Sequence, residues 1–300
     1  MRTILPLVLL ILSVSTNAQP RHIQMDGRKV WVHTIGTAER NPGQPILVFE
    51  SGLGTPLDHW DPILEAASSL GPVLLYDRPG IGRSDPDDAI PTIEYVAEHL
   101  LRLLDHLELP PPYVLIGHSL GGVYVRGFAG YYPETLAGLV IIDPADFTET
   151  EHNKRDHFAV FDWDVTVIDS ILAARSTERA RRRARAPLAI QEEGQALNDL
   201  RKTDFTVLSE RPLPNIPVHI IAGGRFDMPL SMRSKTFDEL VLFQSKMRHR
   251  VARWTEVVQG VDHGALIYCT DAGHFVHRDQ PEIVLASISK VLQDFESMRK

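Results

Sequence analysis

The feature that most constrains the fold is a glycine-rich turn between an apolar run and a periodic one. Residues 113–116 are apolar and favour a β-strand, G-H-S-L-G follows at residues 117–121, and residues 123–131 have the spacing of a helix. A G-x-S-x-G segment in this setting predicts a sharp strand-to-helix turn with the serine at its tip. Glycine is needed at both ends, because side chains there would collide with the neighbouring strand and helix. Ser119 is therefore a candidate nucleophile.

Apolar runs of strand length alternate with helical segments along most of the chain. We expect strands at 46–50, 73–77, 139–143, 218–222 and 265–269, and helices at 58–69, 92–107 and 281–295. Two short alternating runs, 21–26 and 29–34, are joined by Asp26-Gly27 and predict a hairpin. This order predicts an α/β fold with a mostly parallel sheet of the eight-stranded type and helices on both faces. Reactive groups in such sheets gather at the carboxyl ends of the strands.

Residues 145–215 interrupt this alternation, because they hold aromatic residues and a basic run but no clear parallel strand. We expect them to form a helical cap, or lid, inserted before the next-to-last strand. The core domain would then consist of residues 19–144 and 216–300. The basic run, residues 175–185, could indicate a localisation signal or an anion site. We interpret it as the solvated face of a helix.

The first 18 residues have the composition of a secretory signal peptide. Arg2 precedes an apolar stretch at residues 4–12, and small residues follow at 16–18. The sequence therefore predicts export to the periplasm or secretion. An uncleaved anchor is the alternative, but the apolar stretch is shorter than the roughly 20 residues that a membrane span needs. No second stretch of that kind is present, so we expect no stable membrane span.

Composition narrows the classes of partner. The net charge of -8 and the pI near 5.9 argue against a nucleic-acid partner, which would require a basic surface. Cys269 is the only cysteine, so an internal disulfide is impossible, and we expect its side chain to pack in the core. The oligomeric state is not predicted.

Taken together, these segments resemble the α/β-hydrolase superfamily over nearly the whole chain after the signal. The markers are Gly52 and Gly54, the run D-R-P-G-I-G-R-S at 77–84, the turn around Ser119, G-R-F-D at 224–227, A-G-H at 272–274 and Q-P-E at 280–282. The chain order of that superfamily is nucleophile, acid, histidine. The resemblance therefore implies a catalytic triad of Ser119, Asp227 and His274.

Each triad position has an alternative. His277 competes with His274 for the role of base, whereas His118 is expected to pack. Asp143, at the end of the strand 139–143, competes with Asp227 because some relatives carry the acid after that earlier strand.

The resemblance also implies an oxyanion hole made of the backbone N–H groups of Leu53 and Leu120. The chain departs from many relatives in having Ser51 where they have histidine before the glycine. Glu50 and Arg78 end strands that the superfamily places side by side, so we predict an ion pair between them.

Such a triad implies acyl transfer to water, with no cofactor or metal required. We expect a hydrolase for a carboxylic ester of a small or medium apolar acyl group, with the small-molecule acyl compound as its partner. Candidate substrate-binding residues are Trp60, Phe147, Phe161 and Trp163. Lactonase, carbon–carbon bond hydrolase and perhydrolase activities use the same triad and remain open. A non-catalytic ligand-binding member of the fold is the alternative from another class.

Overall fold

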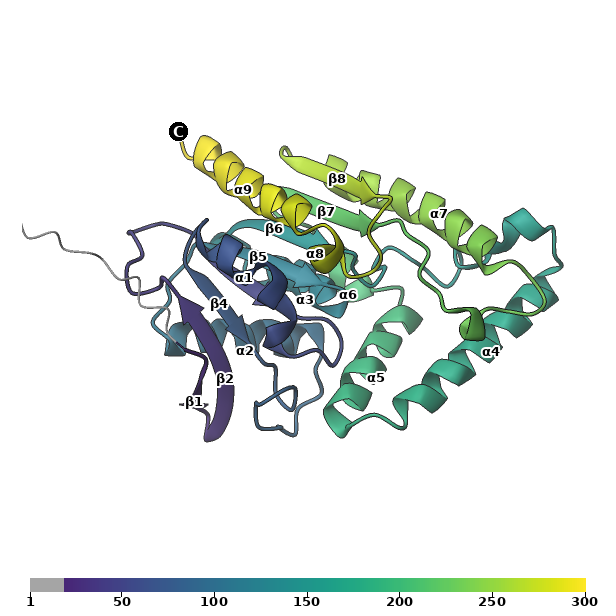
Figure 1. Cartoon of the computed structure of the whole chain (residues 1–300), viewed down its shortest axis with the longest axis horizontal. Helices are drawn as coiled ribbons and strands as arrows, with labels where there is room; N and C mark the ends of the chain where they lie inside the picture. Colours follow the sequence, from purple (N-terminus) through teal and green to yellow (C-terminus); the bar gives the residue numbers. More distant parts are fainter. Residues whose placement is uncertain (1–18) are drawn as a thin grey trace, which may run out of the picture.

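The computed structural model describes residues 19–300, so the predicted signal peptide lies outside the described residues. Its centre is an eight-stranded sheet with the strand order β1-β2-β4-β3-β5-β6-β7-β8 (Figure 1). The strands are β1 (Arg21–Met25), β2 (Arg28–Ile35), β3 (Ile46–Glu50), β4 (Val73–Tyr76), β5 (Tyr113–His118), β6 (Leu136–Ile142), β7 (Val218–Gly223) and β8 (Gly264–Cys269). β1 and β2 pair antiparallel with their neighbours, and the other pairings are parallel. The predicted eight-stranded, mostly parallel sheet is confirmed.

Helices cover both faces of this sheet. The longer helices of the core are α1 (Asp61–Ser68), α2 (Ile93–His106), α3 (Leu120–Tyr131), α7 (Glu239–Gln259) and α9 (Pro281–Met298), with the short α8 (Val276–Asp279) before the last. The apolar side chains of α2, α3 and α7 share one core cluster with the sheet, and those of α1, α8 and α9 share another. The buried strands β3 to β7 separate the two clusters. Single-turn 3-10 helices occur at η1 (Leu57–Trp60), η2 (Pro133–Thr135) and η4 (Leu230–Met232), and a longer one at η3 (Arg155–Phe161).

The sequence pattern failed to predict α7, although it is one of the long helices. Its buried apolar residues include Leu242, Met247, Trp254 and Val258, and charged residues such as Arg248 and Arg250 lie between them. The apolar positions recur every four to seven residues, so a local pattern analysis sees too few of them. Packing against β7 and β8 determines this helix.

The segment between β6 and β7 is mostly helical, and we refer to it as the cap. It contains η3, α4 (Val165–Arg183), α5 (Leu188–Lys202) and α6 (Thr206–Ser209). Figure 1 shows α4 and α5 standing out from the body as a V, on the side to which the strand ends point. Among residues 19–300, the helices fall short of the length and apolarity that crossing a membrane requires.

Candidate active site

Ser119 occupies a strained turn between β5 and α3. Its φ of 56° and ψ of −116° lie in a region that residues other than glycine seldom adopt. The flanking glycines explain how the chain tolerates this turn. A Cβ atom at Gly121 would lie 2.2 Å from the Glu50 carbonyl oxygen, and one at Gly117 would lie 2.5 Å from the Gly121 carbonyl oxygen. The close approach of β3, β5 and α3 therefore requires both glycines.

Three side chains meet at the carboxyl ends of β5, β6 and β8. The Ser119 Oγ atom lies 3.1 Å from His274 Nε2, and His274 Nδ1 lies 2.6 Å from Asp143 Oδ2. The distances suit the tautomer in which Nδ1–H donates to the carboxylate and Nε2 accepts from the serine hydroxyl. The His274 side chain is 46% exposed, whereas that of Asp143 is 8% exposed. The proton acceptor therefore faces the solvent side and its carboxylate partner lies behind it.

Asp143 is held in place by the strand ends around it. It directly follows β6, has a positive φ of 36°, and donates its N–H to the Ile221 carbonyl at 2.7 Å. Its Oδ1 atom accepts from the Gly223 N–H at 3.2 Å and lies 3.7 Å from Arg250 Nη1. One carboxylate oxygen is thus anchored to the protein, which leaves the other to orient the imidazole.

The prediction that Asp227 lies behind His274 is wrong. The guanidinium of Arg225 contacts both oxygens of Asp227, at 2.7 and 3.0 Å, and also Asp279 at 2.8 Å. Asp227 is half exposed and lies near Gly273, but its carboxylate forms an ion pair with Arg225. The sequence held a signal for this outcome, because an arginine two positions before the aspartate can pair with it.

The predicted ion pair between Glu50 and Arg78 is confirmed, and it belongs to a larger buried network. Arg78 also donates to Glu193 Oε1 of α5 and to the carbonyl oxygens of Ser51 and Gly52, each at 2.7 Å. Burial alone would lower the pKa of Arg78, but the charges of Glu193 and Glu50 raise it well above its usual value. The guanidinium therefore stays charged at the base of the loop after β3.

Glu193 links this network to the cap. Its Oε2 atom accepts from the Gly54 N–H at 2.7 Å, and its side chain is almost fully buried. Leu53 precedes that glycine in the loop after β3, and Leu120 is the first residue of α3, directly after Ser119. Within residues 19–300, neither leucine N–H donates a hydrogen bond to another residue. Both predicted oxyanion donors thus keep a free N–H on a fixed segment.

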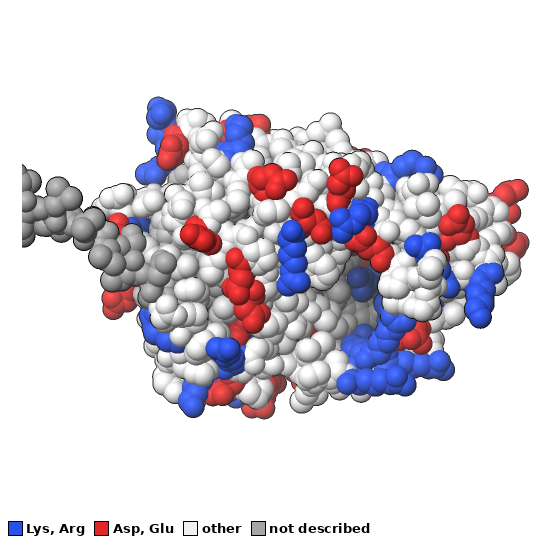
Figure 2. Space-filling model, in the orientation of Figure 1, with Lys and Arg blue, Asp and Glu red and all other residues white. Residues whose placement is uncertain are grey.

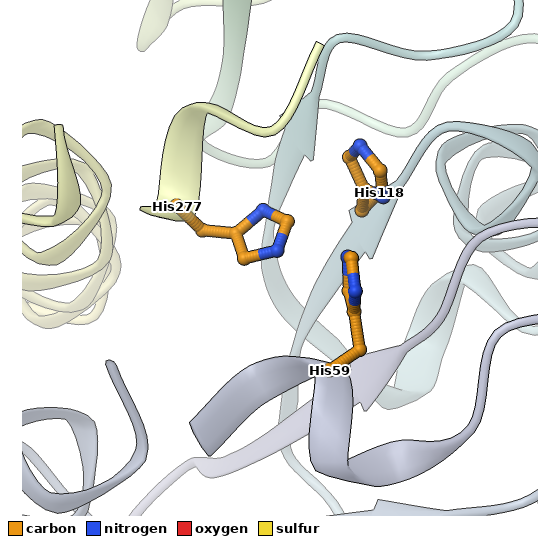
Figure 3. Close-up of side chains that lie close together, drawn as sticks. All are labelled: His59, His118 and His277. Carbon is orange, nitrogen blue, oxygen red and sulfur yellow. The ribbon is translucent and has the colours of Figure 1, made fainter. Parts of the chain in front are cut away.

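Three buried histidines lie together (Figure 3), and the ring centroid of one of them, His118, is 4.6 Å from that of His274. They are His59, His118 and His277, and one nitrogen of each lies within 4.8 Å of the others. Burial lowers the pKa of His59 to about 4 and that of His277 to about 3, and it lowers the pKa of His118 well below its usual value. All three are therefore neutral near pH 7. Sequence spacing gave no sign of this cluster because the three residues come from distant segments.

The cluster fits a metal ion poorly. Arg278 can only donate, and its Nη2 atom lies 2.6 Å from His59 Nδ1. The other nitrogen of His59 must then carry the proton, so it offers no lone pair to a cation. Only two histidines remain as ligands, fewer than the three or four protein ligands of typical zinc sites. The unpaired nitrogens suit a small neutral molecule such as a buried water.

The aromatic residues that were expected to bind substrate lie in different places. Trp60 is 0% exposed and donates from Nε1 to Ser51 Oγ at 3.1 Å, so the prediction that it contacts substrate is wrong. Phe147 is buried in the core cluster on the α3 side of the sheet. Phe161 and Trp163 stack with ring centroids 4.4 Å apart in a small apolar cluster between the cap and α7. His277, the alternative base, is fully buried, and neither of its ring nitrogens hydrogen-bonds to Ser119.

Comparison with known proteins identifies the family of the fold. A family profile described as "Alpha/beta hydrolase family" matches residues 47–287. The chain is 33% identical over 99 residues to the protein YqjL of Bacillus subtilis, and 39% identical over 100 residues to a putative carbamate hydrolase, RutD, of Pseudomonas savastanoi pv. phaseolicola. Each match covers 33% of this chain, and 39% and 38% of those proteins, so it spans about two fifths of their length.

Similarity to solved structures extends over most of the fold. The crystal structure of the enol-lactonase from Burkholderia xenovorans LB400 superposes with a TM-score of 0.58. The alignment covers 91% of this chain and 100% of that one at 20% sequence identity. This level of identity supports a common fold.

Proposed function

Because the chain belongs to the α/β-hydrolase family, we propose that it is a serine hydrolase for a carboxylic ester or a similar acyl compound. The nucleophile is Ser119, the base is His274 and the orienting acid is Asp143. The observation that carries this proposal is the unbroken contact from Ser119 Oγ through both imidazole nitrogens to Asp143 Oδ2.

The mechanism follows from these contacts. A serine hydroxyl is a weak nucleophile at neutral pH, so Nε2 of His274 must remove its proton as Oγ attacks the substrate carbonyl. The imidazolium that forms is stabilised by the carboxylate of Asp143. It then protonates the leaving alcohol, and an acyl-enzyme remains on Ser119. Water, activated by the same imidazole, releases the acid and restores the serine.

The free N–H groups of Leu53 and Leu120 are the proposed oxyanion donors. Leu120 is the first residue of α3, where backbone N–H groups lack partners within the helix. Preorganised donors of this kind stabilise the tetrahedral intermediate, each by roughly 3 kcal/mol. From residues 1–18 we further propose export by a signal peptide.

A fluorophosphonate probe tests the nucleophile directly. We expect the purified protein to be labelled covalently and to release nitrophenol from p-nitrophenyl esters. Ser119→Ala should abolish both signals, and His274→Ala should slow labelling by roughly 1000-fold or more because the hydroxyl loses its base. An ester series from acetate to long chains then defines the acyl group.

Two results would contradict the proposal. A folded wild-type protein that resists the probe and leaves every ester intact would be a ligand-binding member of the fold. Labelling that persists in Ser119→Ala would place the nucleophile elsewhere.

A further inference from the structure

The proposed base, His274, lies in a loop whose main chain makes few hydrogen bonds. The loop follows β8 and precedes α8, and the His274 side chain is 46% exposed. Among residues 19–300, the main chain of His274 makes one hydrogen bond, in which its carbonyl oxygen accepts from Nε2 of His118 at 2.8 Å. His118 is the last residue of β5 and directly precedes Ser119. A buried side chain next to the nucleophile therefore holds the backbone of the base.

This hydrogen bond determines the tautomer of His118. A carbonyl oxygen can only accept, so Nε2 must carry the proton. Burial lowers the pKa of His118 well below its usual value, and the neighbouring His274 and His277 lower it further, so the ring is neutral near pH 7. Nδ1 then carries no proton, and it makes no hydrogen bond within the part of the chain that the structure describes. The ring is thus a neutral donor with a single partner.

The same ring packs against the loop after β3, which carries the proposed oxyanion donor Leu53. A Cβ atom added at Gly52 would lie 3.2 Å from His118 Nδ1 and 3.4 Å from Ser119 Cβ. Gly52 therefore leaves the space that the imidazole occupies. The ring lies between the loop after β3 and the loop after β8, and its own backbone continues into the nucleophile turn. One side chain thus connects all three segments of the proposed catalytic site.

Neighbouring rings confine His118. The His59 ring stacks on it with centroids 5.1 Å apart, and the His277 ring lies edge-on at 4.9 Å. Figure 3 shows these three rings close together. Phe275, the residue after the base, packs at 5.4 Å. Only 1% of the His118 surface is exposed, so these contacts fix the direction in which Nε2–H points.

The outer side of the His274 loop is held by exposed charges. Asp279 accepts from the Gly273 N–H and from Arg225, each at 2.8 Å, and the Arg225 side chain is 42% exposed. Figure 2 shows that acidic and basic side chains lie next to one another on the surface of the body. Exposed pairs of this kind contribute little, because water and salt screen them. The buried hydrogen bond from His118 is therefore better placed to fix His274.

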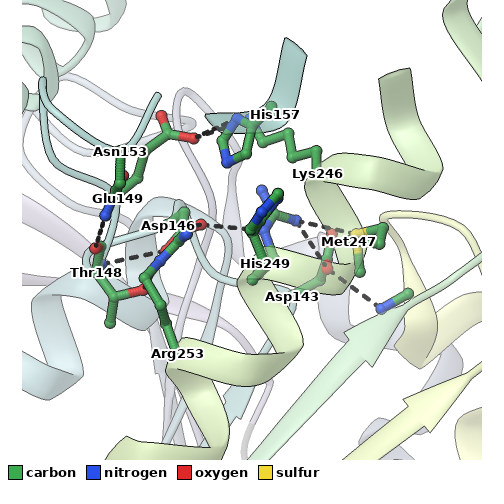
Figure 4. Close-up of polar contacts among 12 residues, drawn as sticks. Asp143, Asp146, Thr148, Glu149, Asn153, His157, Lys246, Met247, His249 and Arg253 are labelled. Atoms are coloured by element: carbon green, nitrogen blue, oxygen red, sulfur yellow. Dashed lines mark hydrogen bonds and ion pairs between the residues drawn. The ribbon is translucent and has the colours of Figure 1, made fainter. Parts of the chain in front are cut away.

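The acid of the proposed triad is held by other residues. Asp143 Oδ1 accepts from the Gly223 N–H at 3.2 Å and lies 3.7 Å from Arg250 Nη1 (Figure 4). Gly223 ends β7 and Arg250 belongs to α7, so these contacts do not involve His118. A change at His118 should therefore displace the base and leave the acid in place.

We propose that His118 is a positioning residue for the hydrolytic reaction. It acts through the backbone of His274, whose imidazole it holds within reach of Ser119 Oγ, and it spaces the oxyanion loop from the same point. This inference rests on the proposed hydrolase function and adds a residue to it. Misplacing reacting groups by about 1 Å can lower a rate about 100-fold, so loss of the hydrogen bond should lower kcat rather than raise KM.

Three variants of His118 test the hydrogen bond, with the p-nitrophenyl ester that the wild type cleaves fastest. His118→Leu fills the space without a donor, so kcat should fall roughly 10- to 100-fold while KM stays within about threefold. Glutamine places an N–H near the position of Nε2, whereas asparagine is one carbon shorter. His118→Gln should therefore restore most of kcat, and His118→Asn should not. Rates are measured at a temperature where circular dichroism shows every variant folded.

His277→Leu is the matched control. His277 is fully buried in the same cluster, but within residues 19–300 neither of its ring nitrogens makes a hydrogen bond. Its replacement should destabilise the fold yet keep kcat within about threefold of the wild-type value. The proposal is overturned if both leucine variants lose kcat equally, if His118→Leu keeps full activity, or if His118→Gln is no more active than His118→Asn.

Crystal structures separate this inference from the hydrolase proposal, because they require no turnover. In His118→Leu, we expect His274 to move by about 1 Å away from Ser119, with Asp143 unmoved. His118→Gln should keep the wild-type arrangement. This outcome would support the positioning role even in a protein that cleaves no ester. An unmoved His274 in His118→Leu would refute the role, whatever the activity of the wild type.

Discussion

At the scale of single residues, two aspartates are candidates for the acid of the proposed triad. Asp143 and Asp227 each follow a strand that lies between β5 and β8, so both are near His274. Asp143 contacts the imidazole at 2.6 Å, whereas Arg225 holds Asp227. We expect Asp143→Asn to lower kcat by roughly 1000- to 10000-fold, because the amide cannot stabilise the imidazolium. Ester hydrolysis at saturating substrate measures this loss.

Asp227→Asn is the control for Asp143→Asn. It should leave kcat within about threefold of the wild-type value, because an exposed ion pair contributes little. If the two variants exchange these effects, the acid is Asp227 and the loop rearranges when substrate binds.

At the scale of elements, α5 of the cap contacts the loop after β3, which carries the proposed oxyanion donor Leu53. Glu193 accepts from the Gly54 N–H, and the side chain of Ile190 would lie 2.9 Å from a Cβ atom at that glycine. Glu193→Gln would leave Arg78 with one carboxylate fewer in a buried site, which destabilises by about 3 kcal/mol or more. We expect a lower melting temperature and a kcat reduced by roughly tenfold at temperatures where the variant is folded, since Leu53 loses its support.

The neighbouring Glu192→Gln serves as the control, because Glu192 makes no hydrogen bond or ion pair within the part of the chain that the structure describes. Its melting temperature and kcat should match those of the wild type. A Glu193→Gln protein that melts early but keeps full kcat would show that the contact supports the fold alone.

At the scale of the whole molecule, buried neutral histidines determine how stability depends on pH. Burial lowers the pKa values of His59, His99 and His157 to about 4 and that of His277 to about 3. An unfolded histidine titrates near 6.5. Between about pH 6.5 and 4 the unfolded chain therefore binds more protons than the folded one, so stability falls as the pH falls through this range. Above pH 7 both states are neutral, and this contribution is constant.

Urea unfolding at pH 7.5, 6.0 and 5.0 measures the effect. We expect the unfolding free energy to decrease steadily, with each buried histidine contributing about 1 to 3 kcal/mol by pH 4. His277→Phe should reduce the slope, whereas a substitution at the exposed His106 should not. A free energy that stays flat from pH 7.5 to 5.0 would contradict the assignment of these histidines as neutral.

The sequence by itself predicted the alternation of strands and helices and the turn that carries Ser119. The glycines at 117 and 121 are required by atoms of neighbouring segments, yet their spacing around the serine is itself a local pattern. His274 could be chosen in the same way, because it follows the last apolar strand and a glycine. The pair Glu50 and Arg78 followed from strand adjacency, which the family resemblance supplied.

Only the tertiary structure decided which side chains from distant segments contact one another. Asp143 rather than Asp227 contacts the imidazole, because Arg225 pairs with Asp227. The contact of Glu193 with Arg78 joins residues 115 positions apart. The sequence suggested Trp60 as a substrate-binding residue, whereas the structure buries it in the core. Within the basic run, tertiary structure likewise decided that Arg175 pairs with Glu239 of α7. Distances between segments that are remote along the chain are properties of packing, so no local pattern contains them.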